Sequence, residues 1–420
     1  MISLDKAEIM APVGSFESLA ASIHAGADSV YFGVTQLNMR AKAAHNMTLT
    51  DLDKIAQIAH DSGVKTYLVV NTLLYDHDTV VMRKIVDTAK ASDIDAIIAF
   101  DFACVNYCNL IKMPVHMSVQ FSISNYETVE FFARHTNRVV LARELNLEQI
   151  RAIYHQITQN QLMGNEGRLM EIEAFAHGAL CVAQSGRCWM SLYTDNSSAN
   201  RGACRQNCRA KYKITDVDTG NELVVDNHYI LSAADICTID ILDQLLQSGV
   251  QVLKIEGRGR SPEYVSTVVK TYKKALVDIE KGEYTKEKVK EYMKDLEKVF
   301  NRKLSHGNYY LGKEIGAYSD VYGSRATHEK EFIGRVVHYF PKVNVAEIKI
   351  DTGEIKKGDN FLFIGATTGT LEGKITELHV DGKTSECASR GDLITFKVSD
   401  RVRINDKLYI VKKKNKYQNT

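Results

Sequence analysis

Up to about residue 260, short and continuous apolar runs alternate with longer amphipathic segments. Eight runs are predicted to be β-strands: Glu8–Ala11, Ser29–Gly33, Thr66–Asn71, Ala96–Phe100, Val115–Gln120, Arg138–Ala142, Glu171–Ala176 and Val252–Glu256. Most of them are apolar at consecutive positions, whereas a strand with one wet face is apolar at every second position. The pattern therefore predicts parallel strands that are buried on both faces.

The segments between these runs carry apolar residues at helical spacing. Four of them are predicted to be helices: Ser15–Ala25, Thr50–Ser62, Thr79–Ala91 and Leu147–Gln156. Eight strand–helix alternations predict an α/β fold, a TIM-like (β/α)8 barrel over residues 1–300, and a doubly wound sheet is the alternative. In such a barrel the chemistry lies at the C-terminal ends of the strands.

The pattern changes after the eighth strand. Two helices are expected at Pro262–Lys281 and Thr285–Phe300, and residues 301–328, rich in Gly, Tyr and Ser, are expected to form a linker. From residue 329 to residue 420, short strands of alternating polarity are separated by glycine-containing turns. This alternation predicts a small, closed C-terminal β-barrel.

Composition and charge narrow the class of protein. Hydrophobic residues make up 45% and charged residues 25%, as in ordinary globular proteins, and a net charge of +1 limits any nucleic-acid surface to a local patch. No apolar stretch is long enough to span a membrane, and the first residues carry charge at Asp5, Lys6 and Glu8 in place of an apolar signal core. We therefore expect a cytoplasmic protein without a membrane partner.

The cysteines are the most informative residues of the sequence. Cys181, Cys188, Cys204 and Cys208 crowd together in an insertion at residues 181–226, which follows the seventh strand. Their neighbours are mostly polar, Gly or Arg, so metal ligation is favoured over burial as free thiols. The spacing leaves zinc and an iron–sulfur cluster open. From the first of these cysteines to residue 213, six basic residues and one acidic residue leave a charge of +5, which favours an anionic thiolate cluster and attracts phosphate.

Polar residues also gather where the predicted strands end. The candidates are Asn71, Gln120, Arg143, Glu144, His177, Lys254, Glu256 and Arg258. Each of them alone has a structural explanation, as a turn residue, a buried histidine or a member of an ion pair. In a barrel, however, at least five strands would deliver these groups to one rim, which favours a shared catalytic site.

Several segments resemble the collagenase-like peptidase family U32. They are EIMAPVGSFESLAASIHAGADSVYFG, SVQFSISN, VVLAREL, HGALCVAQSGRCWMS, NRGACRQNCR and KIEGRGRSPEYV. The resemblance covers essentially the whole chain and implies a [4Fe-4S] cluster on Cys181, Cys188, Cys204 and Cys208, while a role for Cys237 near the site stays open. The length and the C-terminal barrel are similar to those of prephenate-dependent tRNA hydroxylation proteins, which form 5-hydroxyuridine at the wobble position.

This branch of the family implies an enzyme that uses prephenate as co-substrate and binds the anticodon region of tRNA. Prephenate is a dicarboxylate, so Arg143 and Arg258 would suit it as bidentate partners. Glu256 or His177 would act as general base. The cluster would act as an electron carrier or as a Lewis acid. The sequence is compatible with a protein partner or with a homo-oligomer.

Two alternatives stay open. The family name implies a peptidase, although the sequence has neither an HExxH motif nor a GxSxG elbow, and four thiols bound to a metal would remove the best nucleophile candidates. The other alternative is a non-catalytic RNA-binding protein with a structural metal site. RNA binding is expected of the C-terminal β-barrel, whose last residues include Lys412, Lys413 and Tyr409. Trp189, directly after the second clustered cysteine, is expected to shield the cluster from water.

Overall fold

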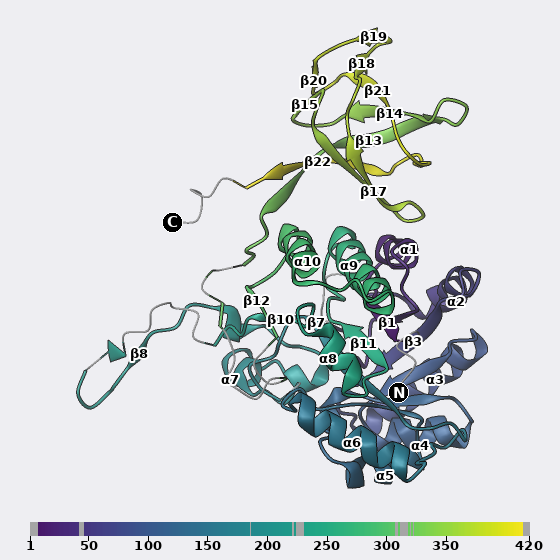
Figure 1. Cartoon of the computed structure of the whole chain (residues 1–420), viewed down its shortest axis with the longest axis vertical. Coiled ribbons are helices and arrows are strands. Elements are labelled where there is room, and N and C mark those ends of the chain that lie inside the picture. The colour runs from purple at the N-terminus through teal and green to yellow at the C-terminus, as the bar shows by residue number, and fades with distance from the viewer. Residues whose placement is uncertain are drawn as a thin grey trace.

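The computed structural model describes residues 7–41, 46–184, 186–220, 222–223, 231–306, 310, 318–319, 321 and 323–414. A parallel β-barrel surrounded by helices forms the lower part of Figure 1, and an antiparallel β-domain lies above it. The β-domain rests on the outer helices α1 (Phe16–His24) and α9 (Pro262–Glu280).

Eight parallel strands form the barrel. They are β1 (Glu8–Pro12), β2 (Ser29–Phe32), β3 (Lys65–Val70), β4 (Ala96–Ala99), β5 (Val115–Met117), β6 (Arg138–Val140), β7 (Glu171–Gly178) and β11 (Val252–Ile255). Each strand pairs with the next in this order, and β11 closes the ring by pairing with both β7 and β1. All eight strands lie at the predicted apolar runs, so the TIM-like barrel is confirmed.

Helices connect these strands on the outside of the barrel. Besides α1 and α9 they are α2 (Leu52–His60), α3 (Thr79–Ala91), α4 (Phe102–Leu110), α5 (Tyr126–Ala133), α6 (Leu147–Gln159), α8 (Leu242–Gln247) and α10 (Lys286–Lys298). At the start of α6, the side chain of Asn146 accepts a hydrogen bond from the N–H of Gln149 and caps the helix. Within the described residues, no helix is long and apolar enough to cross a membrane.

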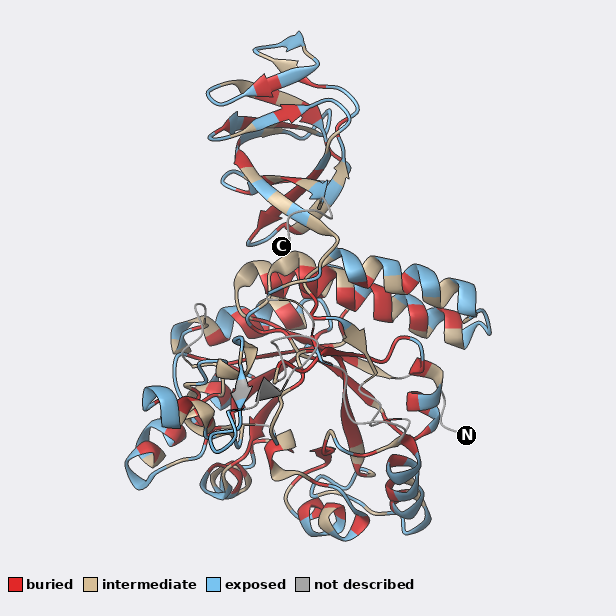
Figure 2. Cartoon of the chain, turned by 90° about the vertical axis from the view of Figure 1, so that its left-hand side faces the viewer, coloured by how far each residue is buried: buried red, intermediate tan, exposed pale blue. Residues whose placement is uncertain are grey.

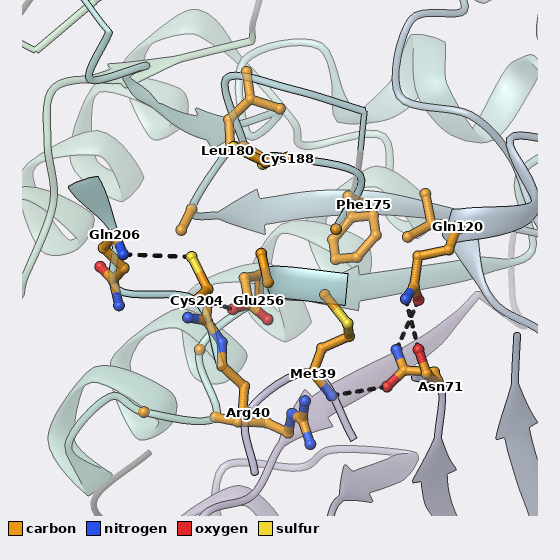
Figure 3. A pocket seen from close by; sticks show the side chains of 18 of the residues that line it. Met39, Arg40, Asn71, Gln120, Phe175, Leu180, Cys188, Cys204, Gln206 and Glu256 are labelled. Carbon is orange, nitrogen blue, oxygen red and sulfur yellow. Dashed lines mark hydrogen bonds and ion pairs between the residues drawn. The ribbon is translucent and has the colours of Figure 1, made fainter. Parts of the chain in front are cut away.

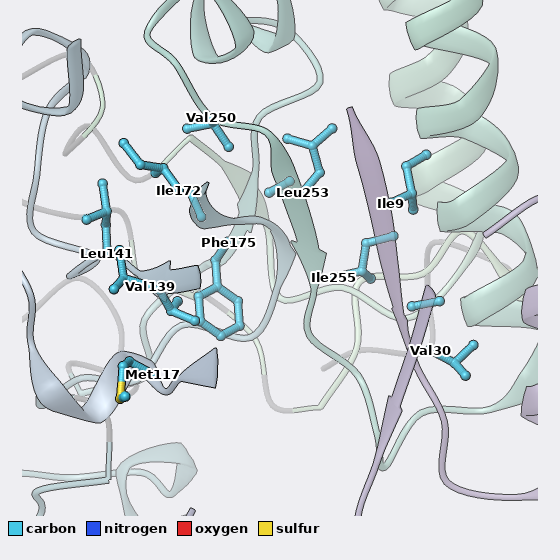
Figure 4. Packing of buried hydrophobic residues seen from close by; sticks show 14 of the residues in the cluster. Ile9, Val30, Met117, Val139, Leu141, Ile172, Phe175, Val250, Leu253 and Ile255 are labelled. Atoms are coloured by element: carbon cyan, nitrogen blue, oxygen red, sulfur yellow. The ribbon is translucent and has the colours of Figure 1, made fainter. Parts of the chain in front are cut away.

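Successive side chains of a strand point to opposite faces, and this alternation builds two layers of core. Ile9, Val30 and Leu253 belong to the large cluster between the barrel and its helices (Figure 4). Their neighbours Met10 and Tyr31 belong to a separate cluster of inward-facing residues. The same alternation therefore brings polar groups of the strands into the barrel interior.

The seventh strand leads into the predicted insertion. Its described part holds α7 (Met190–Asp195) and a hairpin of β8 (Ile214–Thr215) and β9 (Glu222–Leu223), which projects to the left in Figure 1. The chain returns through β10 (Asp235–Cys237), which pairs antiparallel with β7, and β12 (Leu304–Ser305) pairs with β10. The beginning of the predicted linker therefore extends the barrel sheet.

The β-domain follows from residue 328. Its strands are β13 (His328–Phe340), β14 (Val345–Ile350), β15 (Glu354–Lys356), β16 (Asn360–Gly365), β17 (Gly369–Lys374), β18 (His379–Val380), β19 (Lys383–Thr384), β20 (Cys387–Ser389), β21 (Leu393–Lys397) and β22 (Lys407–Lys413). Eight of them form one antiparallel sheet that curls around a single apolar core (Figure 2). In the described residues no pairing joins its end strands β17 and β19, so the sheet is curled where a closed barrel was expected. Residues 415–420 of the predicted RNA-binding tail lie outside the described residues.

Strand β17 packs against α1 and holds the β-domain there. Gly369 has a φ of +63°, and a Cβ atom there would lie 2.7 Å from the backbone nitrogen of Ala21. Glycine is therefore required for this close approach. A second contact joins β13 to α9, because Lys330 Nζ lies 2.6 Å from Glu263 Oε1.

Candidate functional site

A cavity of about 250 Å³ opens at the C-terminal ends of the barrel strands (Figure 3). Side chains from seven strands or the turns after them line it, among them Tyr31, Asn71, Ile98, Gln120, Arg143, Phe175, Lys254, Glu256 and Arg258. The insertion forms another wall with Cys181, Cys188, Cys204 and Cys208. We call this cavity the thiol pocket. It lies at the end of the barrel where the sequence predicted the chemistry.

Two predicted polar residues of the thiol pocket hold each other in place. Asn71 Nδ2 donates to Gln120 Oε1 at 2.9 Å, and the Gln120 side chain donates back to the Asn71 carbonyl at 2.6 Å. Asn71 Oδ1 accepts from the N–H of Met39 at 3.2 Å. These bonds fix the loop after β2 against the ends of β3 and β5, as Figure 3 shows.

Glu144 and His177 do not line the thiol pocket. Glu144 is exposed. His177 is 1% exposed and packs against the rings of Tyr264 and Tyr272 on α9, because β7 runs past this position and pairs there with β10. Burial, aided by the charge of Arg260, lowers the pKa of His177 to about 3. His177 is therefore a neutral core residue, and the structure does not place it as a general base of this pocket.

Glu256 is the carboxylate of the thiol pocket, and its oxygens are already bound. Arg40 Nη2 lies 2.7 Å from Glu256 Oε1, and the Tyr31 hydroxyl donates to Oε2 at 3.0 Å. Burial would raise the pKa of Glu256, but Arg40 and Arg258 lower it to about 2. A carboxylate with so low a pKa is a weak base near neutral pH. The geometry therefore favours Glu256 as an anchor for Arg40 over the predicted role of general base.

Lys254 lies deeper in the same pocket. Its Nζ atom is 2.6 Å from Glu173 Oε1, and the two side chains are 7% and 0% exposed. The Nζ atom also lies over the rings of Tyr31 and Phe175, at 4.6 Å and 5.7 Å from their centroids. An ion pair with Glu256 on the same strand was the structural explanation considered for Lys254, but the partner is Glu173 on β7.

Positive charge dominates the lining of the thiol pocket. Six arginines contribute to it: Arg40, Arg143, Arg209, Arg258, Arg260 and Arg302. In the described part of the chain Arg143 has no hydrogen bond or ion pair, and its guanidinium lies 5.4 Å from the Phe175 ring centroid. Arg258 donates to Asn38 Oδ1 at 3.0 Å, and burial lowers its pKa. Guanidinium groups without carboxylate partners suit a small anion such as a carboxylate or a phosphate.

Three contacts hold the insertion over the pocket. Arg209 donates to two backbone carbonyls at 2.6 Å, one near each end of the insertion. Arg201 forms an ion pair with Asp78 in the turn before α3. Gly202 has a φ of +82°, and a Cβ atom there would lie 2.2 Å from the carbonyl oxygen of Asn38. A side chain at this position would lift the insertion away from the loop after β2.

The four clustered cysteines are free thiols that share one electrostatic environment. Burial raises the pKa of Cys208, Arg209 lowers it, and the charges of the other three thiols raise it again. In the described residues, no three His, Cys, Asp or Glu side chains are gathered as a site for a single metal ion. An all-thiolate set around a cavity fits an iron–sulfur cluster better, since such a cluster is wider than one ion and is bound by thiolates. The cluster itself stays a prediction.

Known proteins share sequence with this chain over most of its length. Residues 14–317 match the family model of peptidase family U32. The chain belongs to this family. A collagenase of Porphyromonas gingivalis is 48% identical to this U32 protein over 402 residues, which cover 96% of this chain and 97% of the relative.

Other relatives carry names from RNA modification. The tRNA hydroxylation protein P1 of Bacillus subtilis is 28% identical over 94% of this chain and 93% of its own length. The 23S rRNA 5-hydroxycytidine C2501 synthase of Escherichia coli is 30% identical over 93% of this chain and 52% of its own length. Membership of the U32 family therefore does not by itself decide between the two reactions.

Two further expectations about this U32 protein are corrected or refined by the structure. Trp189 is 76% exposed, so it does not shield the thiols from water. Cys237 is 2% exposed, its Sγ atom lies 3.9 Å from Met293 Sδ, and burial raises its pKa to about 12. Cys237 does not line the thiol pocket and is a buried thiol in the core of the barrel domain.

Sequence reasoning missed several residues of the U32 pocket, for different reasons. Tyr31 is an inward-facing residue of β2, and the alternation along that strand is a signal that could have found it. Arg260 follows the eighth strand closely in the segment GRGR, where the barrel rule could have included it. Arg40 reaches the pocket from the loop after β2, and Arg302 reaches it from the residues just before the short strand β12; no sequence pattern marks either of them.

Proposed function

We propose that this U32 protein hydroxylates a pyrimidine base of RNA, with the wobble uridine of tRNA as the first candidate and 5-hydroxyuridine as the product. One observation carries the proposal: the thiol pocket combines four cysteines with six arginines, and Glu256 is the one carboxylate among its lining residues. Such a pocket suits an anionic co-substrate and a phosphate-bearing substrate. The relatives named for tRNA and rRNA hydroxylation support the same class of reaction.

We infer that the anionic co-substrate is prephenate. Arg143 and Arg258 would each take one of its two carboxylates, since neither guanidinium forms an ion pair within the described residues. The charge of Lys254 is balanced by Glu173, and that of Arg40 by Glu256. The pocket would therefore gain two charge pairs when the co-substrate binds.

The four cysteines would hold the [4Fe-4S] cluster at the wall of this pocket. A bound cluster would supply one-electron chemistry, since four cysteine ligands would leave none of its irons open. The chain's own residues would position the ligands and enclose the thiol pocket. The paired amides of Asn71 and Gln120 present a fixed polar edge, and the insertion anchored by Arg209 covers the rim.

A cysteine peptidase is the second candidate, because the Porphyromonas gingivalis relative named collagenase is 48% identical. Peptidase chemistry of this kind needs a thiol with a base within hydrogen-bond reach. No histidine is among the residues that line the thiol pocket. The exposed thiol, that of Cys204, accepts a hydrogen bond from the N–H of Gln206 at 3.4 Å. This geometry favours the hydroxylase.

The test is gene deletion with complementation, in a strain that lacks other U32 chains. Total RNA is digested to nucleosides and analysed by mass spectrometry. We expect a hydroxylated pyrimidine to disappear on deletion and to return with the wild-type gene and with the control Arg390→Ala, but not with Arg143→Ala or Cys204→Ala. Unchanged nucleosides, together with peptide cleavage that Cys204→Ala abolishes, would establish the peptidase instead.

A further inference from the structure

A second cavity, of about 580 Å³, adjoins the thiol pocket. Gln206, Asn207, Arg209, Arg260 and Arg302 line both cavities. Four arginines face the second cavity, and Asp195 is the one acidic residue among its lining residues. The two cavities therefore meet at these shared residues, and together they line a positively charged path across the insertion.

Three of these arginines have guanidinium N–H donors that are available to a ligand. Arg205 is exposed, and its side chain has no hydrogen bond or ion pair in the described part of the chain. Arg260 and Arg302 lie over the same Phe300 ring, at 3.5 Å and 5.0 Å from its centroid. Arg302 has a weak pair with Asp235 at 3.5 Å, whereas the side chain of Arg260 has no hydrogen bond or ion pair within the described residues. Neighbouring guanidinium groups with few hydrogen-bond or ion-pair partners attract phosphate.

Two large aromatic side chains stand uncovered beside this path. Trp189 is 76% exposed and Tyr193 is 93% exposed. They are four residues apart, and the N–H of Tyr193 donates to the carbonyl of Trp189, the residue that caps α7, at 2.8 Å, so both lie on one face at the start of this helix. The flanking residues Cys188 and Met190 line the thiol pocket, which places Trp189 at its rim.

We propose that Trp189 and Tyr193 stack on nucleobases of single-stranded RNA while Arg205, Arg260 and Arg302 hold its phosphates. This inference rests on the proposed function and adds the surface that presents the RNA. Exposed aromatic faces beside cationic side chains are the common means of binding single strands. A base next to the stacked ones would then be turned into the thiol pocket, as enzymes that modify bases require. A duplex keeps its bases stacked inside and cannot use Trp189 in this way.

The chain contains one tryptophan, so fluorescence excited selectively at tryptophan reports on Trp189 alone. The full chain is titrated with a stem–loop RNA that carries uridines in its loop, with the matching duplex and with a collagen-like peptide. We expect the stem–loop to quench the fluorescence and the other two ligands to leave it unchanged. By anisotropy of labelled RNA, Trp189→Ala and Tyr193→Ala should weaken binding about 5- to 150-fold, since each removes one stacking contact. Trp189→Phe should retain most of the affinity.

Matched controls separate these contacts from general effects. Phe131 on α5 is 47% exposed, and Phe131→Ala should leave RNA binding unchanged. Arg205→Ala should reduce the slope of log affinity against log salt by about 0.7, the value for one phosphate contact of a single strand, while Arg390→Ala in the β-domain should not.

The outcomes distinguish the inference from the proposed function. The inference would be overturned if RNA binding depends on salt while RNA leaves the Trp189 fluorescence unchanged and Trp189→Ala binds RNA as tightly as the wild type. That result would leave the proposed hydroxylase intact. A wild-type chain that binds the collagen-like peptide and none of the RNAs would overturn both. Far-UV circular dichroism of each variant checks that these surface substitutions leave the fold unchanged.

Discussion

Replacing Lys254 with methionine should cost the barrel a large part of its stability. The Lys254 ammonium lies 2.6 Å from Glu173 Oε1, and both side chains are almost completely buried. The second oxygen, Glu173 Oε2, has no hydrogen-bond partner among the described residues. The carboxylate therefore depends on Lys254, and Lys254→Met keeps the apolar stem while it removes the charge.

Two estimates give the same magnitude for the loss in free energy of unfolding. Unit charges about 4 Å apart interact by about 4 kcal/mol at an effective dielectric constant of about 20. Removing one partner of a buried ion pair costs about 3–5 kcal/mol, because the remaining charge is left unpaired in the interior. Against a usual free energy of unfolding of about 5–15 kcal/mol, such a variant would still fold but with a much lower urea midpoint.

Urea unfolding, followed by the far-UV signal of the helices, measures this loss on the barrel, since all described helices precede the β-domain. Lys254→Met with Glu173→Leu should recover most of the loss, because the double variant leaves no unpaired charge. Lys357→Met is the matched control. It breaks an exposed pair with Glu386 of 3.1 Å and should cost less than about 1 kcal/mol. A loss below about 1 kcal/mol for Lys254→Met, or a double variant no more stable than the single one, would refute the reasoning.

Three further predictions concern the core histidine, the insertion and the thiols. The pKa of His177 falls from 6.5 to about 3 on folding, so the unfolded chain takes up the proton first as the pH falls. The free energy of unfolding should therefore decrease by up to about 1.4 kcal/mol per pH unit between pH 6.5 and pH 3, and His177→Leu should flatten that slope in acid titrations. Gly202→Ala should speed up amide hydrogen exchange in the insertion, and unchanged exchange would contradict the close approach to Asn38. After anaerobic purification, Cys181→Ala should lack the iron and sulfide of the wild type, whereas the exposed control Cys387→Ala should retain both.

The barrel could be predicted from the sequence because its strands are continuous apolar runs, and parallel strands covered on both faces demand that composition. Strands β10 and β12 could not, because stretches of three and two residues carry no period. That omission had a consequence for the site. His177 was placed at the rim by strand counting, but pairing with β10 carries β7 further and leaves the imidazole in the core beside Tyr272.

The candidate site was predictable where the chain is regular. Arg143, Glu256 and Arg258 follow strand ends, and the barrel rule brings them to one rim without any side-chain information. The partners of these residues were not predictable, because Arg40 reaches Glu256 across 216 positions from a loop. The cysteines were visible as a cluster, yet their spacing alone left zinc and an iron–sulfur cluster open.

A peptide substrate and the ligands of base hydroxylation differ in charge, so they suit different charge patterns in the thiol pocket. A buried cation without an ion-pair partner is unfavourable, and in the free protein that cost falls on Arg258, which is 8% exposed and forms no ion pair among the described residues. An anionic ligand offsets it. A collagen-like peptide has an uncharged backbone and would leave the guanidinium groups of Arg143 and Arg258 unpaired, whereas a dicarboxylate beside an RNA phosphate would pair them. The charge of the thiol pocket is therefore a stronger argument for RNA chemistry than the name of any relative is for proteolysis.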